Sequence, residues 1–294
     1  PWDALTRVVG LHRLVAGEPT GLPEPVQRTA RLLTALIVER AVTLSGSTSL
    51  EALGAAGDPC VMPHARTLVM LTHGGPRTGD TRADRPIAAA SIEDPLNGRT
   101  PQTLDDAGWD TIHQAFLQEA AHCLKAGAHA LGVEAARGHL WHTTLSPLLG
   151  ARGDEGLRRL QHLVSALRAL TPRVMVSLPV EDAAVGGIHP ARGVELARHL
   201  AHAGASMIVV RTGSPQLPAR LHPPEPRMPE EEGPALHAAL WVKRALPLTT
   251  VLTAGAIRSE HVALQAIQRG FGDGVIVGRP LRQGRTLTAD PAGG

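Results

Sequence analysis

The sequence lacks tyrosine altogether, and aromatic residues make up only 2% of its 294 positions. A mechanism that needs a phenol as proton donor is therefore excluded, and the core must be built from Leu, Val, Ala and Ile. Lysine occurs only at Lys125 and Lys243, both in stretches with helical spacing. Schiff-base catalysis needs a lysine in the active site. A lysine-dependent aldolase therefore has no candidate residue.

Cysteine, long apolar runs and excess charge are equally scarce. Cys60 and Cys123 have neither C-x-x-C nor metal spacing, so we expect no disulfide framework and no zinc ribbon, as in a reducing cytoplasm. No apolar run approaches ~20 residues and no signal-like segment is present, which argues against membrane insertion and export. The formal net charge is +2 and arginines are scattered among acidic residues. Nucleic acid is therefore not an expected partner.

Short apolar runs of strand length alternate with longer stretches of helical spacing. This alternation is typical of parallel βαβ construction. With 43% hydrophobic and 19% charged residues, most of the chain is expected to bury a core. We therefore predict an α/β fold, a single (β/α)8 TIM barrel domain over residues 1–294 with shortened loops at its mouth. The predicted strands are 13–16, 35–38, 67–71, 130–134, 174–178, 207–210, 250–253 and 274–277.

Four stretches between these runs have an apolar helix face, namely 109–126, 157–170, 193–203 and 259–269. The Pro-rich stretch 214–234 has no apolar periodicity, so we expect a surface excursion near the barrel mouth. In such barrels the working groups stand where strands end and βα loops begin. That rule nominates Glu39, His73, Glu134, Arg137, His139, Ser177, Glu181, Asp182, Arg211 and Arg279.

Several motifs occur in a recognisable order. Residues 116–152 contain a helix, a G-V-E strand, a histidine-bearing loop and an L-S-P turn, after RPIAAASI at 85–92. THGG stands at 72–75, TAGAI at 253–257 and GDGVIVGRPL at 272–281. Together these motifs resemble the old yellow enzyme family of flavin oxidoreductases. The resemblance implies a TIM barrel that descends from an FMN-binding ancestor.

The resemblance also implies where flavin contacts have changed. The family's third-strand glutamine, which binds the flavin pyrimidine, falls on Met70, and its fifth-strand arginine falls on Ser177. The phosphate end persists as Gly255, Gly278 and Arg279, because loops after the last two strands commonly bind phosphate through N–H groups and an arginine fork. The alternative is an inherited turn in which Arg279 is salt-bridged or solvated.

The family's substrate clamp and proton donor are replaced as well. If a two-residue deletion precedes Glu134, then Glu134 and Arg137 replace the clamp and His139 replaces the tyrosine. If the gap lies elsewhere, Glu134 matches the family's strand-end glutamate and the clamp histidines are missing. An acid, a fixed cation and an imidazole at one strand end suffice for proton transfer and oxyanion stabilisation. The alternative is an ion pair that only shapes the loop.

Further residues are candidates for substrate binding. Trp141 stacks on a substrate or fills the barrel mouth, and Arg211 clamps a carboxylate or enolate or else bridges to the 230–232 acidic run. No metal is expected, because no third ligand with motif spacing accompanies His139 and His142. The predicted substrate-binding residues are His73, Met70, Trp141, Ser177 and Arg211.

These inferences converge on a cytoplasmic small-molecule biosynthetic enzyme. We predict that it works without a cofactor and catalyses a non-redox cyclisation, rearrangement or isomerisation of a conjugated, polyketide-like substrate, with Glu134, Arg137 and His139 as catalytic residues. The alternatives are an FMN-dependent NAD(P)H ene-reductase and a non-catalytic scaffold. A small-molecule partner and a possible homodimer complete the prediction.

Overall fold

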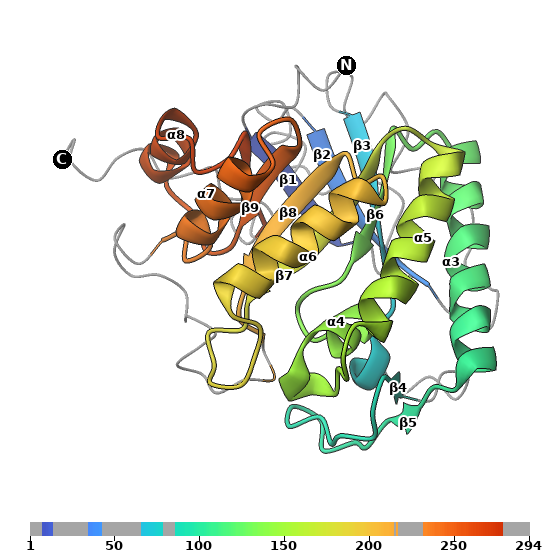
Figure 1. Ribbon diagram of the computed structural model, residues 1–294. Coiled ribbons are helices and arrows are strands. Elements are labelled where there is room, and N and C mark those ends of the chain that lie inside the picture. Colours follow the sequence, from blue (N-terminus) through green and yellow to red (C-terminus); the bar gives the residue numbers. More distant parts are fainter. Residues whose placement is uncertain are drawn as a thin grey trace.

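Eight parallel strands close into a barrel in the computed structural model, which describes residues 8–13, 35–42, 66–78, 86–214, 216 and 232–278. The strands neighbour one another in the order β1-β10-β9-β8-β7-β6-β3-β2, as Figure 1 shows in part. They are β1 Val8–Arg13, β2 Ala35–Ala41, β3 Arg66–Thr72, β6 Ala130–Glu134, β7 Val174–Glu181, β8 Met207–Thr212, β9 Thr250–Ala254 and β10 Gly274–Val277.

The positions of seven strands agree with the sequence prediction, and the first does not. The prediction placed it at 13–16, whereas β1 occupies Val8–Arg13. The reason is pairing: Val9 lies beside Ile276 of β10 and Ala35 of β2, so the apolar Val8-Val9-Gly10-Leu11 run closes the barrel. The prediction also ended β7 too early, because its pairing with β8 continues to Glu181 through a register shift.

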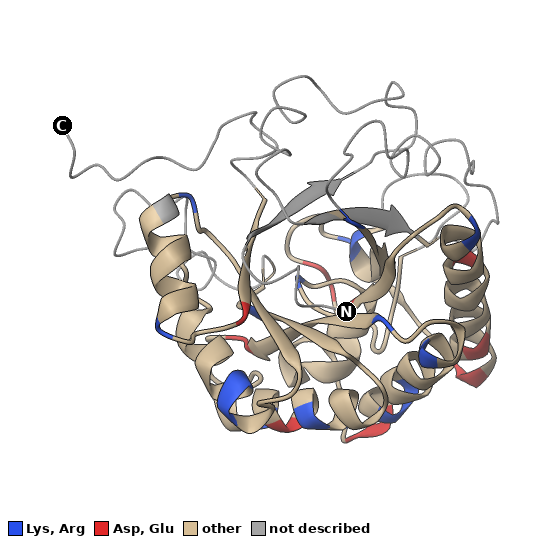
Figure 2. Cartoon of the chain, turned by 90° about the horizontal axis from the view of Figure 1, so that it is seen from above, with Lys and Arg blue, Asp and Glu red and all other residues tan. Residues whose placement is uncertain are grey.

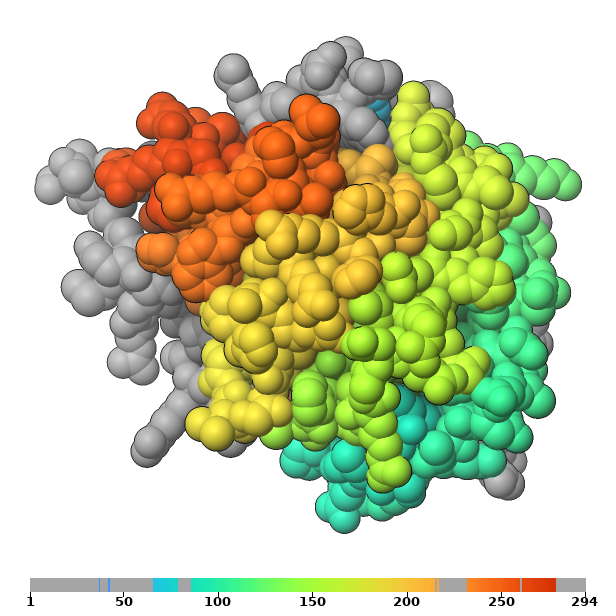
Figure 3. Space-filling model, viewed as in Figure 1, coloured from blue at the N-terminus to red at the C-terminus, as the bar shows by residue number. Residues whose placement is uncertain are grey.

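Helices cover the outside of the barrel along part of its circumference (Figure 2). In the space-filling view α5, α6 and α7 lie side by side over one face (Figure 3). Asp105 caps α3 through Gly108 N, and Ser259 caps α8 through Val262 N, as expected for N-cap residues. No helix in the described ranges combines the length and the apolar character needed to cross a bilayer. The outer helices are α3 Asp106–Lys125, α5 Glu155–Leu170, α6 Pro190–His202, α7 Leu236–Ala245 and α8 Glu260–Gln268.

Short elements follow the strand ends at the barrel mouth. Helix α4 spans Leu140–Leu145, and the one-turn helices η2 and η3 span Gly75–Arg77 and Pro147–Leu149. A small two-stranded sheet pairs β4, Ile87–Ala88, with β5, Gln102–Thr103. Figure 1 places these pieces beyond the ends of the central strands. They build the rim on which the candidate site stands.

Side chains inside the barrel form a cluster separate from the layer under the helices. Alternate strand residues point to opposite faces. A Cβ at Gly132 would lie 2.9 Å from both Met70 Sδ and Met175 Cε, so the glycine leaves room for these two flexible side chains in the interior. The interior cluster consists of Ile37, Leu68, Met70, Ala130, Met175, Met207, Val209, Leu252, Ala254 and Ile276.

Candidate functional site

A buried carboxylate stands at the centre of the barrel mouth. Glu134 ends β6, two residues after Gly132, so its side chain points into the barrel and is fully buried. Its Oε1 accepts hydrogen bonds from Ser177 Oγ at 2.7 Å and from Ala136 N at 3.1 Å. Its Oε2 lies 2.7 Å from Arg137 Nη2. The strand ends of β6 and β7 therefore meet at this carboxylate.

A second arginine reaches the same cluster from β8. Arg211 follows the interior residue Val209 by two positions, so it shares the inward face. Its Nε donates to Ser177 Oγ at 2.9 Å and lies 3.9 Å from Glu134 Oε2. The alternative of a surface arginine is wrong, because this side chain is only 12% exposed. Of the acidic run 230–232 that was proposed as its surface partner, Glu232 binds Arg258 and Ser259, and residues 230 and 231 lie outside the described residues.

The charges around Glu134 keep it ionised despite its burial. Burial opposes ionisation, but Arg137, Arg211 and His139 attract the negative form and Ser177 donates to it, which together lower the pKa to about 2. The carboxylate is therefore a permanent anion at neutral pH. In this state it pairs with Arg137 and lies 3.9 Å from Arg211.

The turn that carries Arg137 is strained and held from several sides. Arg137 has φ +60, in the left-handed region that disfavours side chains, and Gly138 follows with φ +72. Arg77 Nη1 donates to Arg137 O at 2.8 Å, and Gln216 Nε2 donates to Gly138 O at 3.2 Å. Gly138 N donates to His142 Nδ1 at 2.8 Å. These contacts fix the Arg137 backbone in its unfavourable conformation.

His139 lies on the same rim. Its Nδ1 is 2.6 Å from the Thr72 hydroxyl at the end of β3. The neighbouring His73 is buried, its Nδ1 accepts from Gly75 N at 3.0 Å, and its carbonyl accepts from Leu140 N. His139 is therefore held by a side chain of the mouth, whereas His73 supports the η2 turn.

A buried Ser, His and Asp also meet beside the mouth, but not as a nucleophilic triad. His142 Nε2 lies 3.0 Å from Asp182 Oδ1, and Ser146 Oγ donates to Asp182 Oδ2 at 2.6 Å. A triad requires the serine to bond the histidine. Burial opposes ionisation of Asp182, but the bonds from His142, Ser146 and Ile188 N lower its pKa. This network is a structural brace between α4 and the loop after β7.

Other predicted residues lie in varied places. Trp141 was wrongly assigned to the mouth: its ring is buried outside the barrel, 5.3 Å from Trp109 and 5.9 Å from Phe116. Met70 pairs with Gly132, one layer below Glu134, and is part of the barrel interior. Ser177 and Arg211 belong to the central cluster. No group of three or more potential metal ligands occurs within the described ranges.

The predicted phosphate end is only partly described. Gly255 follows β9 with φ +137, and Ala256 follows with φ +52. Gly278 directly follows β10, which pairs with β9. Arg279 lies outside the described residues, as do 217–231 of the Pro-rich loop and the side chain of Glu39.

Sequence reasoning missed Gln216 and Asp94. Gln216 Nε2 donates to Asp94 Oδ2 at 2.6 Å as well as to Gly138 O. These residues are far apart in the sequence, and no motif spacing connects them. A Cβ at position 138 would lie 1.7 Å from Gln216 Oε1, so with Gln216 in this place only glycine fits there. The glycine between Arg137 and His139 is thus the one feature of the sequence that indicates a close contact at this turn.

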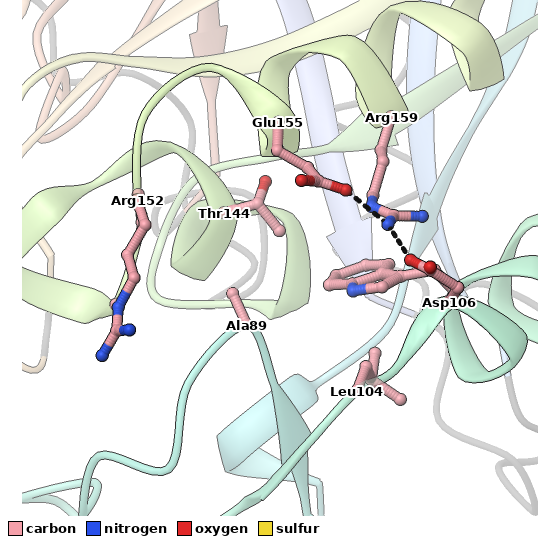
Figure 4. Close-up of a pocket in the computed structure, with 11 residues that line it drawn as sticks. Ala89, Leu104, Asp106, Thr144, Arg152, Glu155 and Arg159 are labelled. Carbon is pink, nitrogen blue, oxygen red and sulfur yellow. Dashed lines mark hydrogen bonds and ion pairs between the residues drawn. The ribbon is translucent and has the colours of Figure 1, made fainter.

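A cavity of about 240 Å³ lies apart from this cluster, between α3, α5 and the η3 turn. Figure 4 shows Arg159 held between Asp106 and Glu155 at its edge. The Arg159 guanidinium also lies 5.7 Å from the centre of the Trp109 ring. None of the residues that line this cavity belongs to the cluster at the barrel mouth.

Comparison with known proteins agrees with the fold. No family model matches the chain. A segment is 28% identical over 137 residues to an NADPH dehydrogenase of Clostridium acetobutylicum, a match that covers 43% of this chain and 40% of that relative. A 2-naphthoyl-CoA reductase bound to 2-naphthoyl-CoA is similar with a TM-score of 0.77 and 16% identity, over 92% of this chain and 48% of that chain. This chain thus spans about half the length of that reductase.

Morphinone reductase in complex with tetrahydroNAD is similar along nearly the whole of both chains. The TM-score is 0.70 at 16% identity, over 97% of this chain and 89% of that chain. These likenesses confirm the TIM barrel. The prediction that the enzyme works without a cofactor is wrong, because the relatives are a dehydrogenase named for NADPH and a reductase bound to a nicotinamide analogue. The prediction took the replacement of two flavin-binding residues, by Met70 and Ser177, as evidence that the whole cofactor site was lost.

Proposed function

We propose, on the premise that this chain is an old-yellow-enzyme-like barrel, that it is an FMN-dependent oxidoreductase that uses NAD(P)H to reduce a conjugated small molecule. The match to an NADPH dehydrogenase carries the proposal, because it is the likeness that extends to sequence. The net reaction adds a hydride and a proton across a C=C bond and oxidises NAD(P)H to NAD(P)+. A non-redox cyclisation has no comparable support.

The residues present fit FMN at two places. Ser177 on β7 carries no positive charge for the flavin ring. Arg211 on the neighbouring strand β8 would supply that charge, because its Nε donates a hydrogen bond to Ser177 Oγ at 2.9 Å. At the phosphate end, Gly255 and Ala256 form a positive-φ turn after β9. Consecutive backbone N–H groups in such turns form concavities that bind anions. Gly255 and Gly278 would therefore hold the phosphate, and Arg211 would supply the positive charge near the ring.

FMN supplies hydride transfer when bound, and the protein supplies charge, orientation and a proton. Glu134 stays ionised and holds Arg137 and Arg211. His139, held through Nδ1 by Thr72, would deliver the proton from Nε2 to the substrate carbon. The substrate is a small molecule in this proposal. The homodimer and the cytoplasmic location remain predictions.

Reconstitution with FMN tests the cofactor. We expect purified protein to retain one FMN per chain after gel filtration, measured by flavin absorbance against protein content. Arg211→Gln should weaken FMN binding about tenfold, the usual cost of losing a charged hydrogen-bond donor. Arg192→Gln on α6, whose guanidinium pairs with Asp154 and Glu195, is the matched control and should bind FMN as wild type does. Wild-type protein that elutes without flavin would overturn the proposal.

A further inference from the structure

We propose that His142 is a positioning residue for His139, because its ring binds the turn that leads into His139 and is itself held by Asp182. The inference rests on the proposed function for the role of His139 as proton donor. It goes beyond that function, since it gives a part in the reaction to a buried histidine and a buried aspartate beside the mouth. Neither residue needs to touch the substrate.

The hydrogen bonds of His142 fix which ring nitrogen carries the hydrogen. Gly138 N donates to His142 Nδ1 at 2.8 Å, so Nδ1 must present a lone pair. The hydrogen of the neutral ring is therefore on Nε2, which lies 3.0 Å from Asp182 Oδ1 and donates to it. The side chains of His142 and Asp182 are both 0% exposed. The two bonds of the ring are thus shielded from solvent and have a defined direction.

Asp182 is anchored through its other carboxylate oxygen. Ser146 Oγ donates to Asp182 Oδ2 at 2.6 Å, and Ile188 N donates to the same oxygen at 2.8 Å. The backbone N–H of Asp182 donates to Ile188 O at 2.9 Å. A carboxylate held in this way sets the tautomer and the orientation of the imidazole that it contacts. The loop after β7 therefore fixes the ring of His142, which belongs to α4.

The bond from Gly138 acts on the backbone at the start of α4. His139 is the N-cap residue of this helix, and His142 is its third residue. In a capping box the side chain of the third residue accepts from the backbone N–H of the cap. Here it accepts from the residue before the cap. Gln216 Nε2 donates to Gly138 O at 3.2 Å, so both polar groups of the Gly138 backbone are bound.

The position of the His139 ring depends on this turn. Arg137 has φ +60 and Gly138 has φ +72, and such a turn persists only where surrounding contacts over-determine it. The ring of His139 is in turn fixed at Nδ1, 2.6 Å from Thr72 Oγ1. Loss of the bond to His142 would let the turn relax and move His139 relative to Thr72. A displacement of about 1 Å can slow a reaction about 10²-fold.

Two substitutions of His142 separate its two hydrogen bonds. The side-chain oxygen of asparagine lies as many bonds from Cα as Nδ1 does, so His142→Asn can still accept from Gly138 N. The side-chain nitrogen of glutamine lies as many bonds from Cα as Nε2 does, so His142→Gln can donate to Asp182 but leaves Gly138 N without its acceptor. Both variants should have a lower urea midpoint, because each loses one buried hydrogen bond.

NMR of the FMN-reconstituted protein reads the turn without any substrate. We expect exchange of the Gly138 amide hydrogen to be slow in wild type and in His142→Asn, and at least about tenfold faster in His142→Gln. The nitrogen chemical shifts of the His139 ring should divide the three proteins in the same way. In wild type the hydrogen of the His142 ring should be on Nε2. His199→Gln on α6, whose side chain is 46% exposed, is the matched control.

The rate of alkene reduction gives the second measurement. With trans-cinnamaldehyde as the conjugated probe, His142→Gln should react about 10²-fold more slowly than wild type, and His142→Asn should recover most of that loss. Reduction of bound FMN by NADPH should be equally fast in all three proteins, because it needs no proton from His139. A structural role alone would instead make the rates follow the urea midpoints.

The outcomes separate this inference from the proposed function. A hydrogen on Nδ1 of wild-type His142 would overturn the inference even if neither variant folds. Equal exchange of the Gly138 amide in the two variants would overturn it as well. The expected exchange pattern in protein that never oxidises NADPH would support the positioning of His139 and contradict the reductase. NADPH oxidation in protein whose two variants behave alike would do the reverse.

Discussion

Glu134→Ala is expected to reduce the free energy of unfolding by about 3–5 kcal/mol, the usual result of removing one partner from a buried ion pair. The carboxylate is fully buried, and Arg137, Ser177 and Ala136 N all lie within hydrogen-bond distance of it. Its loss removes the negative charge that lies beside the guanidinium groups of both Arg137 and Arg211. Urea denaturation at neutral pH measures the effect. Glu195→Ala, which removes an exposed carboxylate paired with Arg192, should leave the midpoint unchanged.

Glu134 also makes the free energy of unfolding depend on pH, and the direction of that dependence can be predicted. The pKa of Glu134 is lowered in the folded state to about 2, from an ordinary value of 4.5. The stabilisation is therefore complete above pH 4.5 and disappears as the pH falls toward about 2. Glu134→Gln should lack this part of the acid destabilisation. A variant with wild-type stability at neutral pH and wild-type acid sensitivity would show that the cluster contributes nothing.

His139→Asn is expected to slow alkene reduction about 10²–10⁴-fold, the range for loss of a general acid. The rate at which NADPH reduces bound FMN should not change, because that half-reaction needs no proton from His139. Stopped-flow measurement of each half-reaction separates the two effects. His122→Asn on α3, whose side chain is 57% exposed, is the matched control. Equal slowing of both half-reactions would assign His139 a structural role instead.

The sequence predicts both the strands and the central cluster, because the positions of the strands also determine where their ends lie. Apolar runs of strand length identify parallel strands, and side chains at their ends must meet at one rim. Glu134, Arg137, Ser177 and Arg211 come together on that basis. Trp141 does not stand at a strand end, so this rule does not place it in the mouth. It lies in α4, and its ring packs outward against Trp109.

Two features could not be predicted because they depend on contacts between distant segments. Gln216 reaches Gly138 across 78 positions, and no motif spacing connects the two residues. The second feature misled the prediction of the cofactor. Ser177 alone suggests a lost positive charge, whereas Arg211 from the neighbouring strand brings a guanidinium to the Ser177 hydroxyl. Loss of a residue at one position therefore does not establish loss of its charge from the site.

Anaerobic mixing of the FMN-reconstituted protein with NADPH tests the central claim most directly. If the barrel is a flavin oxidoreductase, the blue absorbance of the bound flavin should disappear as an equal amount of NADPH is oxidised, and it should return when an unsaturated substrate or oxygen is admitted. Bound flavin that stays oxidised in excess NADPH would contradict the account.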